Sequence, residues 1–438
     1  MAKAFIAGAA CADISPVDSQ FLAGYPHVER WSTGIHDPLL SSALFMNDGE
    51  TPVIMVSDDI LYVPKSLVAR ARARIEKATG IPAKNILIAS THSHSGPIVE
   101  KRGPGSYDTI TPDCDDAYLQ LMEDGIVKAA TAAFKAAKPA EIGLGVGRVS
   151  GIGTNRRSPD GPSDPEVPVF AVRDASTHEY IAILDGYAMH PTVLHEDSKL
   201  VSADFPGASR AYLRNKLGKD LPIVHFMGAS GNQSPRYCVR GQTFEEATRL
   251  GTILGKAIEE TLPTIKYIPG ATIKTTSTGI EYPLRKLPTV AEAEAKVKAV
   301  REKFARQQHD GTPRAVVRTT ECDLFGAEAT HALALSNEKG GIEAALKQSM
   351  PAEIMIVRVG DWTFVGWQGE IFIEYALAIR KANPNTFVFT CANGNTAGYL
   401  TTEEAAREGG YEASTSVFAT TGGDVLVKAT QDLLDSMK

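Results

Sequence analysis

Two histidines, His92 and His94, lie one residue apart in the segment ASTHSHSGP, which directly follows the short apolar run NILIA. In α/β folds, the loops that follow strands commonly carry the chemistry. We therefore expect one histidine to bind a metal ion and the other to face a substrate. Two loop histidines held by backbone hydrogen bonds would give the same pattern, so further segments must decide between the two interpretations.

Four more segments place polar side chains after apolar runs. In chain order they are GYAMHPT with His190, GASGNQSP with Ser234, WQGE with Glu370, and a polar loop over 393–416 with Tyr399 and Tyr411. Ser234 stands at a predicted strand-to-helix turn, but its segment does not match the G-x-S-x-G nucleophile elbow. No H-E-x-x-H, P-loop or G-x-G-x-x-G pattern occurs, which removes the common zincin, phosphate-loop and dinucleotide interpretations.

Short β-branched runs alternate with helical patterns along the chain, which predicts an α/β fold with a mainly buried sheet. Helices are expected over 65–79, 115–137, 205–217, 244–262, 290–307, 371–382 and 425–437. The polar helix at 290 and the residues after it predict a helical insertion at about 285–348. A cap over the site, a subunit contact and a simple solvated helix are all compatible with its composition.

Composition excludes several classes of protein. The 438 residues carry a net charge of −7, which argues against a nucleic-acid surface. No run approaches the roughly 20 apolar residues of a membrane span. The five cysteines are scattered, odd in number and without a C-x-x-C pair, which favours buried free thiols in a reducing compartment. The first residues read as a β-strand rather than a signal peptide, so we expect a cytoplasmic protein.

Taken together, these segments resemble the catalytic domain of the neutral ceramidase family. The shared motifs run in order through nearly the whole chain: DISP at 13–16, GIHDPL at 34–39, THSHSGP at 91–97, NR at 155–156, AMHPT at 188–192, GASGNQSP at 228–235, GE at 369–370, GYLTT at 398–402 and GYEAST at 410–415. The resemblance implies one catalytic domain over 1–438, with a mixed β-sheet core flanked by helices.

The resemblance also implies one zinc ion per chain, held by His92, His190, Glu370 and Tyr399. Two imidazoles and a carboxylate form the arrangement of several catalytic zinc sites, in which one position stays open for water. Zinc polarises a carbonyl and lowers the pKa of bound water toward about 7. Tyr399 would be an unusual further ligand.

By the same resemblance, His94, Tyr411 and the arginine of the NR motif lie beside the scissile carbonyl. The chain reads Asn-Arg-Arg, so this arginine is Arg156 or Arg157, and we favour Arg156. These groups are candidate donors to the tetrahedral oxyanion. His94 and Tyr411 both remain candidates for the general base. Ser234 aligns with a family serine once considered a nucleophile, and covalent catalysis by it is the second mechanism.

The leading hypothesis is therefore a zinc-dependent hydrolase of a carbon–nitrogen amide bond in a small soluble substrate, cyclic amides included. We expect neither the family's immunoglobulin-like domain nor a secretion signal here. For this reason a ceramidase that acts on N-acyl sphingosine is the second hypothesis. A zinc esterase or lactonase comes third, and a non-catalytic ligand-binding protein is the hypothesis from a different class. Tyr25, Trp31 and Tyr237 are candidate pocket aromatics, and a homo-oligomer is left open.

Overall fold

A large mixed sheet forms the centre of the protein. The computed structural model describes residues 4–100, 108, 110–396 and 398–438. The strand order in the large sheet is β11-β9-β8-β6-β1-β3-β4-β5. Its members are β1 (Ile6–Asp13), β3 (Leu40–Asn47), β4 (Pro52–Asp58), β5 (Ile86–Ser90), β6 (Lys138–Arg148), β8 (Glu166–Asp174), β9 (Tyr180–Tyr187) and β11 (Ile223–Met227). Neighbours are antiparallel except for β4 with β5 and β9 with β11.

A second sheet packs face to face on the first. Its order is β13 (Ile273–Ile280), β14 (Ala352–Val359), β15 (Trp362–Trp367) and β17 (Thr386–Phe389). One hydrophobic core joins the two sheets, with Leu44 and Phe226 from the first and Met355 and Phe364 from the second. Residues next in sequence, such as Val365, point to the opposite face because side chains alternate along a strand.

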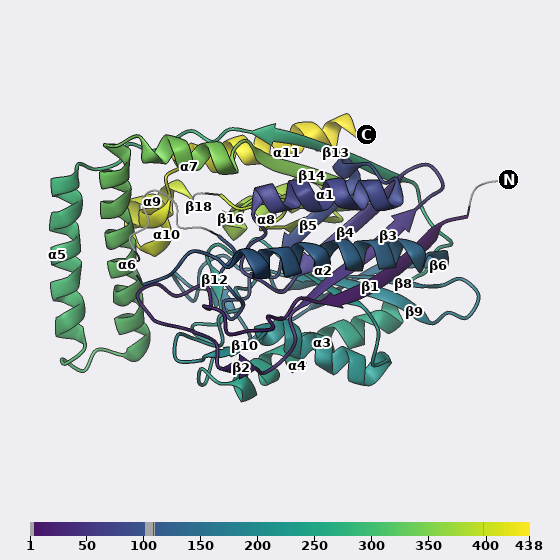
Figure 1. Cartoon of the computed structure of the whole chain (residues 1–438), viewed down its shortest axis with the longest axis horizontal. Helices are drawn as coiled ribbons and strands as arrows, with labels where there is room; N and C mark the ends of the chain where they lie inside the picture. Colours follow the sequence, from purple (N-terminus) through teal and green to yellow (C-terminus); the bar gives the residue numbers. More distant parts are fainter. Residues whose placement is uncertain (1–3, 101–107, 109, 397) are drawn as a thin grey trace.

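Helices cover the outer faces of both sheets, so the layers are helix, sheet, sheet and helix (Figure 1). The large sheet packs against α1 (Lys65–Thr79), α2 (Asp116–Lys135), α3 (Asp204–Leu217) and α4 (Phe244–Thr261), and the small sheet against α8 (Ile373–Ala382) and α11 (Thr421–Ser436). The mixed-sheet α/β class predicted from the sequence is confirmed. The division of the strands between two sheets was not predicted, because both sheets use the same kind of apolar run.

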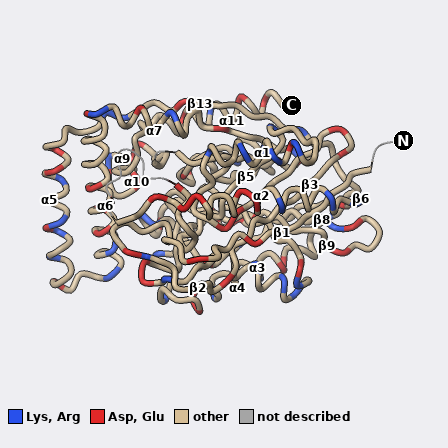
Figure 2. The backbone as a smooth tube through the Cα atoms, in the orientation of Figure 1, with Lys and Arg blue, Asp and Glu red and all other residues tan. Residues whose placement is uncertain are grey.

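Three helices occupy residues 290–349: α5 (Val290–Gln307), α6 (Arg314–Asn337) and α7 (Gly341–Ser349). Figure 1 shows α5 and α6 as an antiparallel pair at one end of the molecule, beside α9 (Glu403–Glu408) and α10 (Tyr411–Thr415). Val297, Val300, Leu324 and Ala327 join α5 to α6. Charges of both signs follow α5 along its length (Figure 2), whereas α6 lies between α5 and the rest of the fold.

Six two-residue strands and two 3-10 helices of the described chain lie in the segments that connect the longer elements. They are β2 (Gly34–Ile35), β7 (Thr154–Asn155), β10 (Leu200–Val201), β12 (Gln233–Ser234), β16 (Glu370–Ile371), β18 (Tyr399–Leu400), η1 (Ala83–Asn85) and η2 (Leu262–Thr264). No disulfide joins the five cysteines, all of which lie in the described part of the chain, and only two of them, Cys114 and Cys391, are buried, fewer than expected. Among the described helices, none has the length and apolar character that crossing a membrane requires.

Candidate metal centre and active site

The large sheet curls so that its two edge strands approach each other, which gathers the loops after several strands. β11 lies close to β4 and β5, although it stands at the opposite end of the strand order. The segment after β17 fills the gap: the Thr390 amide donates to the Met227 carbonyl over 2.9 Å, and the Ser90 amide donates to the Cys391 carbonyl over 3.2 Å. Residues that follow β5, β9, β11 and β15 therefore meet in one place.

His92, His190 and Glu370 converge at this point, and all three are buried. Glu370 Oε2 lies 3.0 Å from His190 Nε2 and 3.4 Å from His92 Nε2. The two imidazole rings stand nearly perpendicular, with centroids 4.7 Å apart. His92 has a positive φ of 65°, a backbone conformation that non-glycine residues adopt at a cost and that is concentrated at functional sites.

Backbone carbonyls fix the tautomer of both histidines. His92 Nδ1 donates to the Leu61 carbonyl over 2.9 Å, and His190 Nδ1 donates to the Ser230 carbonyl over 2.6 Å. Each Nε2 therefore presents a lone pair, as in a metal-bound histidine whose other nitrogen is held by a second partner. Burial also lowers the pKa of His190 to about 4, so the ring is neutral at neutral pH. Two Nε2 atoms and one carboxylate oxygen at this spacing fit a zinc ion.

Two tyrosines flank the Glu370 carboxylate. Tyr399 stands beside Glu370 because β16 and β18 pair in parallel at this register. Tyr62 donates its hydroxyl hydrogen bond to Glu370 Oε1. Burial alone would raise the pKa of Glu370, but His92 and His190 outweigh it and hold that pKa well below its usual value. The carboxylate is therefore ionised, which is the form that could bind a metal ion.

Tyr62 is absent from the residues singled out in the sequence. Its signal is weak, since Leu61 and Tyr62 follow β4 with no distinctive motif. β4 and β5 are parallel neighbours, so the segments after them reach the same edge of the sheet. A search of the residues that follow β4, the strand paired with β5 before His92, would therefore have found Tyr62.

His94 lies beside the three converging groups, with its ring centroid 4.9 Å from that of His92 and 5.7 Å from that of His190. Its Nδ1 donates to the Gly24 carbonyl over 3.1 Å. Its Nε2 is shielded from solvent and has no hydrogen-bond partner among the described residues. The ligand-type nitrogens of His92, His94 and His190 all lie within 4.8 Å of one another, so His94 is also close enough to bind a metal ion.

Arg156, and not Arg157, faces the site. The Arg156 guanidinium carbon lies 5.5 Å from the centre of the Tyr399 ring, and Nη2 donates to the Gly231 carbonyl over 2.7 Å. Arg157 instead points away, to Glu412 and Glu408 at 3.0 and 2.9 Å. Of the two arginines in the Asn-Arg-Arg motif, Arg156 is therefore the one that lines the cavity beside the metal centre.

Tyr411 and Ser234 also border the site. The Tyr411 ring lies 6.0 Å from the Tyr399 ring, centroid to centroid, and burial first, then Glu370, raises the pKa of Tyr411. Ser234 is buried in β12, and its hydroxyl accepts a hydrogen bond from the Arg236 amide over 3.3 Å. No histidine or carboxylate of the described chain hydrogen-bonds the Ser234 hydroxyl, so nothing there activates it as a nucleophile.

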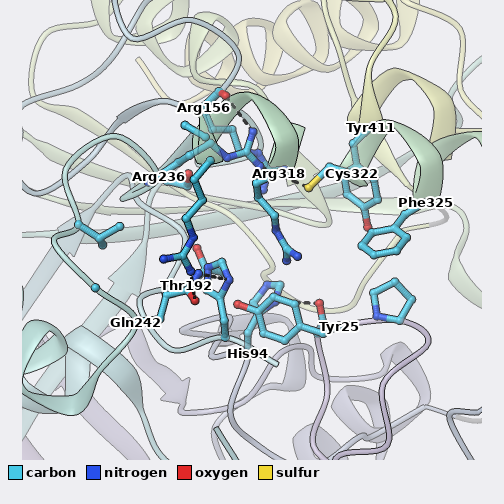
Figure 3. A pocket seen from close by; sticks show the side chains of 18 of the residues that line it. Tyr25, His94, Arg156, Thr192, Arg236, Gln242, Arg318, Cys322, Phe325 and Tyr411 are labelled. Carbon is cyan, nitrogen blue, oxygen red and sulfur yellow. Dashed lines mark hydrogen bonds between the residues drawn. The ribbon is translucent and has the colours of Figure 1, made fainter. Parts of the chain in front are cut away.

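A cavity of about 370 Å³ opens beside these residues (Figure 3). Arg318, Cys322 and Phe325 of α6 form one wall and face Tyr25 and His94. A second hollow of about 390 Å³ lies on the Glu370 side of His94. Of the three aromatics suggested by the sequence, Tyr25 lines both spaces, whereas Trp31 and Tyr237 line neither and are 44% and 39% exposed.

The protein is therefore a four-layer α/β protein with a candidate metal centre, formed by two histidines and a glutamate at one edge of the large sheet. The family "Neutral/alkaline non-lysosomal ceramidase, N-terminal" matches residues 5–229. The chain belongs to this family, as its sequence motifs predicted.

Individual relatives are distant. The chain is 23% identical over 214 residues to a neutral ceramidase of Mycobacterium tuberculosis, and 23% identical over 235 residues to one of Pseudomonas aeruginosa. These matches cover 45% and 49% of this chain, but only 33% and 34% of the two relatives.

Solved structures extend the similarity of the fold to almost the whole chain. A crystal structure of neutral ceramidase from Pseudomonas aeruginosa has a TM-score of 0.77 at 18% identity, covering 97% of this chain and 73% of that one. A structure titled "Ceramidase complexed with C2" has a TM-score of 0.73 at 16% identity, covering 97% of this chain and 74% of that one. At these identities the likeness establishes the fold.

Proposed function

We propose that this protein is a zinc-dependent hydrolase that cleaves the carbon–nitrogen bond of an amide. The observation that carries the proposal is the convergence of His92 Nε2, His190 Nε2 and Glu370 Oε2 over 3.0 to 3.4 Å, with both histidine tautomers fixed by backbone carbonyls. Structural zinc sites prefer cysteine ligands, whereas two histidines and a glutamate are typical of catalytic ones. Membership of a family of ceramidases, which act on amides, supports the same reaction class.

His92, His190 and Glu370 would hold the ion, with Tyr399 beside them as the fourth group that the family resemblance assigns. A zinc ion bound there would polarise the amide carbonyl and lower the pKa of a water molecule. Tyr62, through its hydrogen bond to Glu370 Oε1, would keep the other carboxylate oxygen turned toward the histidines. One zinc ion per chain is expected.

The chain's own residues would carry the proton transfers and stabilise charge. His94 is the candidate general base, because its Nδ1–H is engaged by the Gly24 carbonyl and its Nε2 is left as a buried acceptor. The Arg156 guanidinium and the Tyr411 hydroxyl are donors for the negative charge that develops on the amide oxygen. Ser234 would contact the substrate without forming a bond to it.

Ceramide is the second candidate for the substrate, favoured by the names of the relatives and by apolar side chains in the second hollow, such as Leu22, Ile98 and Leu333. The same site chemistry would also cleave esters and lactones. The test is a panel assayed with chelator-stripped protein before and after addition of zinc: N-acyl amines, N-acyl sphingosine in detergent, matched esters and lactones.

Zinc-restored hydrolysis of amides would support the proposal, and N-acyl sphingosine as the best substrate would make the protein a ceramidase. Turnover of esters or lactones alone would replace the amide hydrolase with an esterase. Zinc binding without turnover of any member would favour a ligand-binding protein, and full activity after removal of the metal would contradict zinc dependence.

A further inference from the structure

The cavity beside the metal centre has an unusual charge. Arg156, Arg236, Arg240, Arg314 and Arg318 line it, while none of its described lining residues is aspartate or glutamate. The chain as a whole has a net charge of −7, so this accumulation of positive charge does not follow from composition. Figure 3 shows the guanidinium groups of Arg236 and Arg318 projecting into the cavity.

Two of the five arginines have carboxylate partners. Arg156 pairs with Glu412, and Arg318 pairs with Glu196 and Glu321 at 3.0 and 2.6 Å. The charge of these two guanidinium groups is therefore largely compensated by the protein itself.

The other three arginines have no salt bridge to a carboxylate within the described part of the chain. Arg236 is half-buried and donates only to neutral acceptors: the Arg156 carbonyl at 3.2 Å, the Thr319 hydroxyl at 3.5 Å and the Cys322 sulfur at 3.6 Å. Arg314 is exposed and donates to the Gln242 side-chain oxygen over 2.9 Å, and Arg240 is also exposed. Glu412 influences Arg236 electrostatically, but it already has two arginine partners.

The arginines also affect the pKa of His195, which lines the same cavity. Burial first, then Arg318, Arg236 and Arg314, lower the pKa of His195 to about 3, against an opposing effect of Asp197. The ring is thus neutral and adds no further positive charge. Guanidinium groups form their strongest hydrogen bonds with carboxylates and phosphates. Arginines that line a cavity without a carboxylate partner are therefore suited to bind an anionic ligand.

The second hollow has a different character. Beside Asp108 and the groups of the metal centre, its wall includes the apolar side chains of Leu22, Leu61, Ile98, Ala329 and Leu333. The two spaces share Tyr25, His94, Tyr399 and Tyr411, so they meet at the residues proposed to act on the amide. A substrate spanning both would place its scissile bond between an apolar part and an anionic part.

We propose that the substrate is an N-acyl amino acid, in which an apolar acyl chain occupies the second hollow and the carboxylate of the amine part is bound by Arg236 and Arg314. The proposal rests on the proposed amide hydrolase function. Hydrolysis breaks the amide C–N bond, joins the oxygen of water to the acyl carbon, and transfers one water proton to the departing nitrogen. The second water proton then passes from the new carboxylic acid to the released amine. The products are a fatty carboxylate and an amino acid.

Binding is measured with ketone analogues that cannot be hydrolysed, by calorimetry on the zinc-loaded protein. 4-Oxononanoate carries the carboxylate, and 4-oxononanamide is its neutral counterpart. We expect the anion to bind at least about tenfold more tightly. The ratio of the two affinities should fall to about 1 in the double variant Arg236→Gln/Arg314→Gln and stay unchanged in Arg306→Gln, an exposed arginine of α5 outside the cavity.

Equal affinities, no measurable binding of the anion, or an anion preference that survives the double variant would overturn the proposal. The last result would place the carboxylate on the metal or on the arginines that the double variant leaves intact.

Hydrolysis of N-hexanoylglycine and N-hexanoylglycinamide separates this proposal from the proposed function. Zinc-dependent cleavage of both amides with equal kcat/KM would support the amide hydrolase function but contradict the assignment of an N-acyl amino acid as the substrate. Cleavage of neither amide, when zinc restores cleavage of another amide of the panel, would likewise contradict this assignment. Absence of zinc-dependent cleavage of any amide would contradict the hydrolase and with it the substrate assignment. A kcat/KM at least about tenfold higher for N-hexanoylglycine, lost in the double variant, is the supporting result.

Discussion

Arg156 and Glu412 form an ion pair in the wall of the site, with 2.7 Å between Nε and Oε1 and with both side chains buried. They are far apart in the sequence, since Arg156 directly follows β7 and Glu412 lies at the start of α10. Arg157 binds the second oxygen of the same carboxylate at 3.0 Å. Glu412 thereby holds both arginines, and its neighbour Glu408 draws only Arg157 away from the cavity.

Glu412→Gln should destabilise the protein by about 3 kcal/mol at pH 7, because it leaves a buried guanidinium without its counter-ion. Burial alone would raise the pKa of Glu412, but Arg156 and Arg157 outweigh it and lower that pKa. The ion pair therefore stabilises the fold above about pH 4.3, the usual glutamate pKa, and its contribution is lost as the pH falls through the lower pKa of the folded state.

Urea unfolding at neutral and acidic pH measures this effect. The difference between wild type and Glu412→Gln should shrink below about pH 4. Glu408→Gln removes the exposed partner of Arg157 and should change the free energy of unfolding by less than about 1 kcal/mol. A loss in Glu412→Gln no larger than in this control would contradict the role of the buried pair.

His92→Ala and His190→Ala should each lose bound zinc, because each removes one of the converging Nε2 atoms. His94→Ala should keep about one zinc per chain and lose at least about a hundredfold in kcat, as expected for a general base. Elemental analysis of the purified variants, with exposed His309→Ala as the control, distinguishes the two groups. Loss of zinc from His94→Ala would instead make His94 a ligand, which its distances also permit.

Tyr62→Phe should weaken zinc binding by about 10- to 100-fold, because it removes the hydrogen bond that orients Glu370. Competition with a zinc chelator measures this affinity. Tyr118→Phe is the control, since Tyr118 is buried and its hydroxyl has no hydrogen-bond partner in the described chain. Unchanged zinc affinity in Tyr62→Phe would show that the hydroxyl does not position the carboxylate.

Gly24→Ala should lower kcat by about a hundredfold while zinc is retained. A Cβ at this position would lie 2.3 Å from His94 Nδ1, and the backbone has a φ of 100°. Gly151→Ala separates backbone strain from displacement of His94, because Gly151 has a φ of 74° and nothing within 4 Å of its Cβ position. Equal losses of kcat in the two variants would show that backbone strain, and not displacement of His94, lowers the activity.

Ser234→Ala should keep kcat within about tenfold of wild type, because no histidine or carboxylate among the described residues hydrogen-bonds the Ser234 hydroxyl. A covalent nucleophile would lose on the order of 10⁴-fold or more. Steady-state kinetics on the best substrate of the panel distinguishes these outcomes. A loss of the larger size, with the fold intact by circular dichroism, would restore the covalent mechanism.

The sequence by itself determined the fold class, the family and the set of polar residues that follow its strands. Short apolar runs rich in β-branched residues and helices with period 3.6 are local patterns, so 65–79 and 244–262 were recognisable as helical without tertiary information. His92, His190 and Glu370 were recognisable because each comes soon after an apolar run, where a buried strand reaches the edge of its sheet. The motifs shared with the family then linked positions that are far apart in the chain.

Only the tertiary structure decided which side chains meet. Arg156 and Arg157 are neighbours of the same type that share Glu412, and the additional contact with Glu408 holds Arg157 away from the cavity. Tyr62 reaches Glu370 because β4 lies beside β5, and Arg318 reaches the cavity because α6 packs along its wall. Such contacts depend on packing between segments separated by hundreds of residues, and no local propensity or spacing encodes them. The charge of the cavity therefore became visible only in the folded protein.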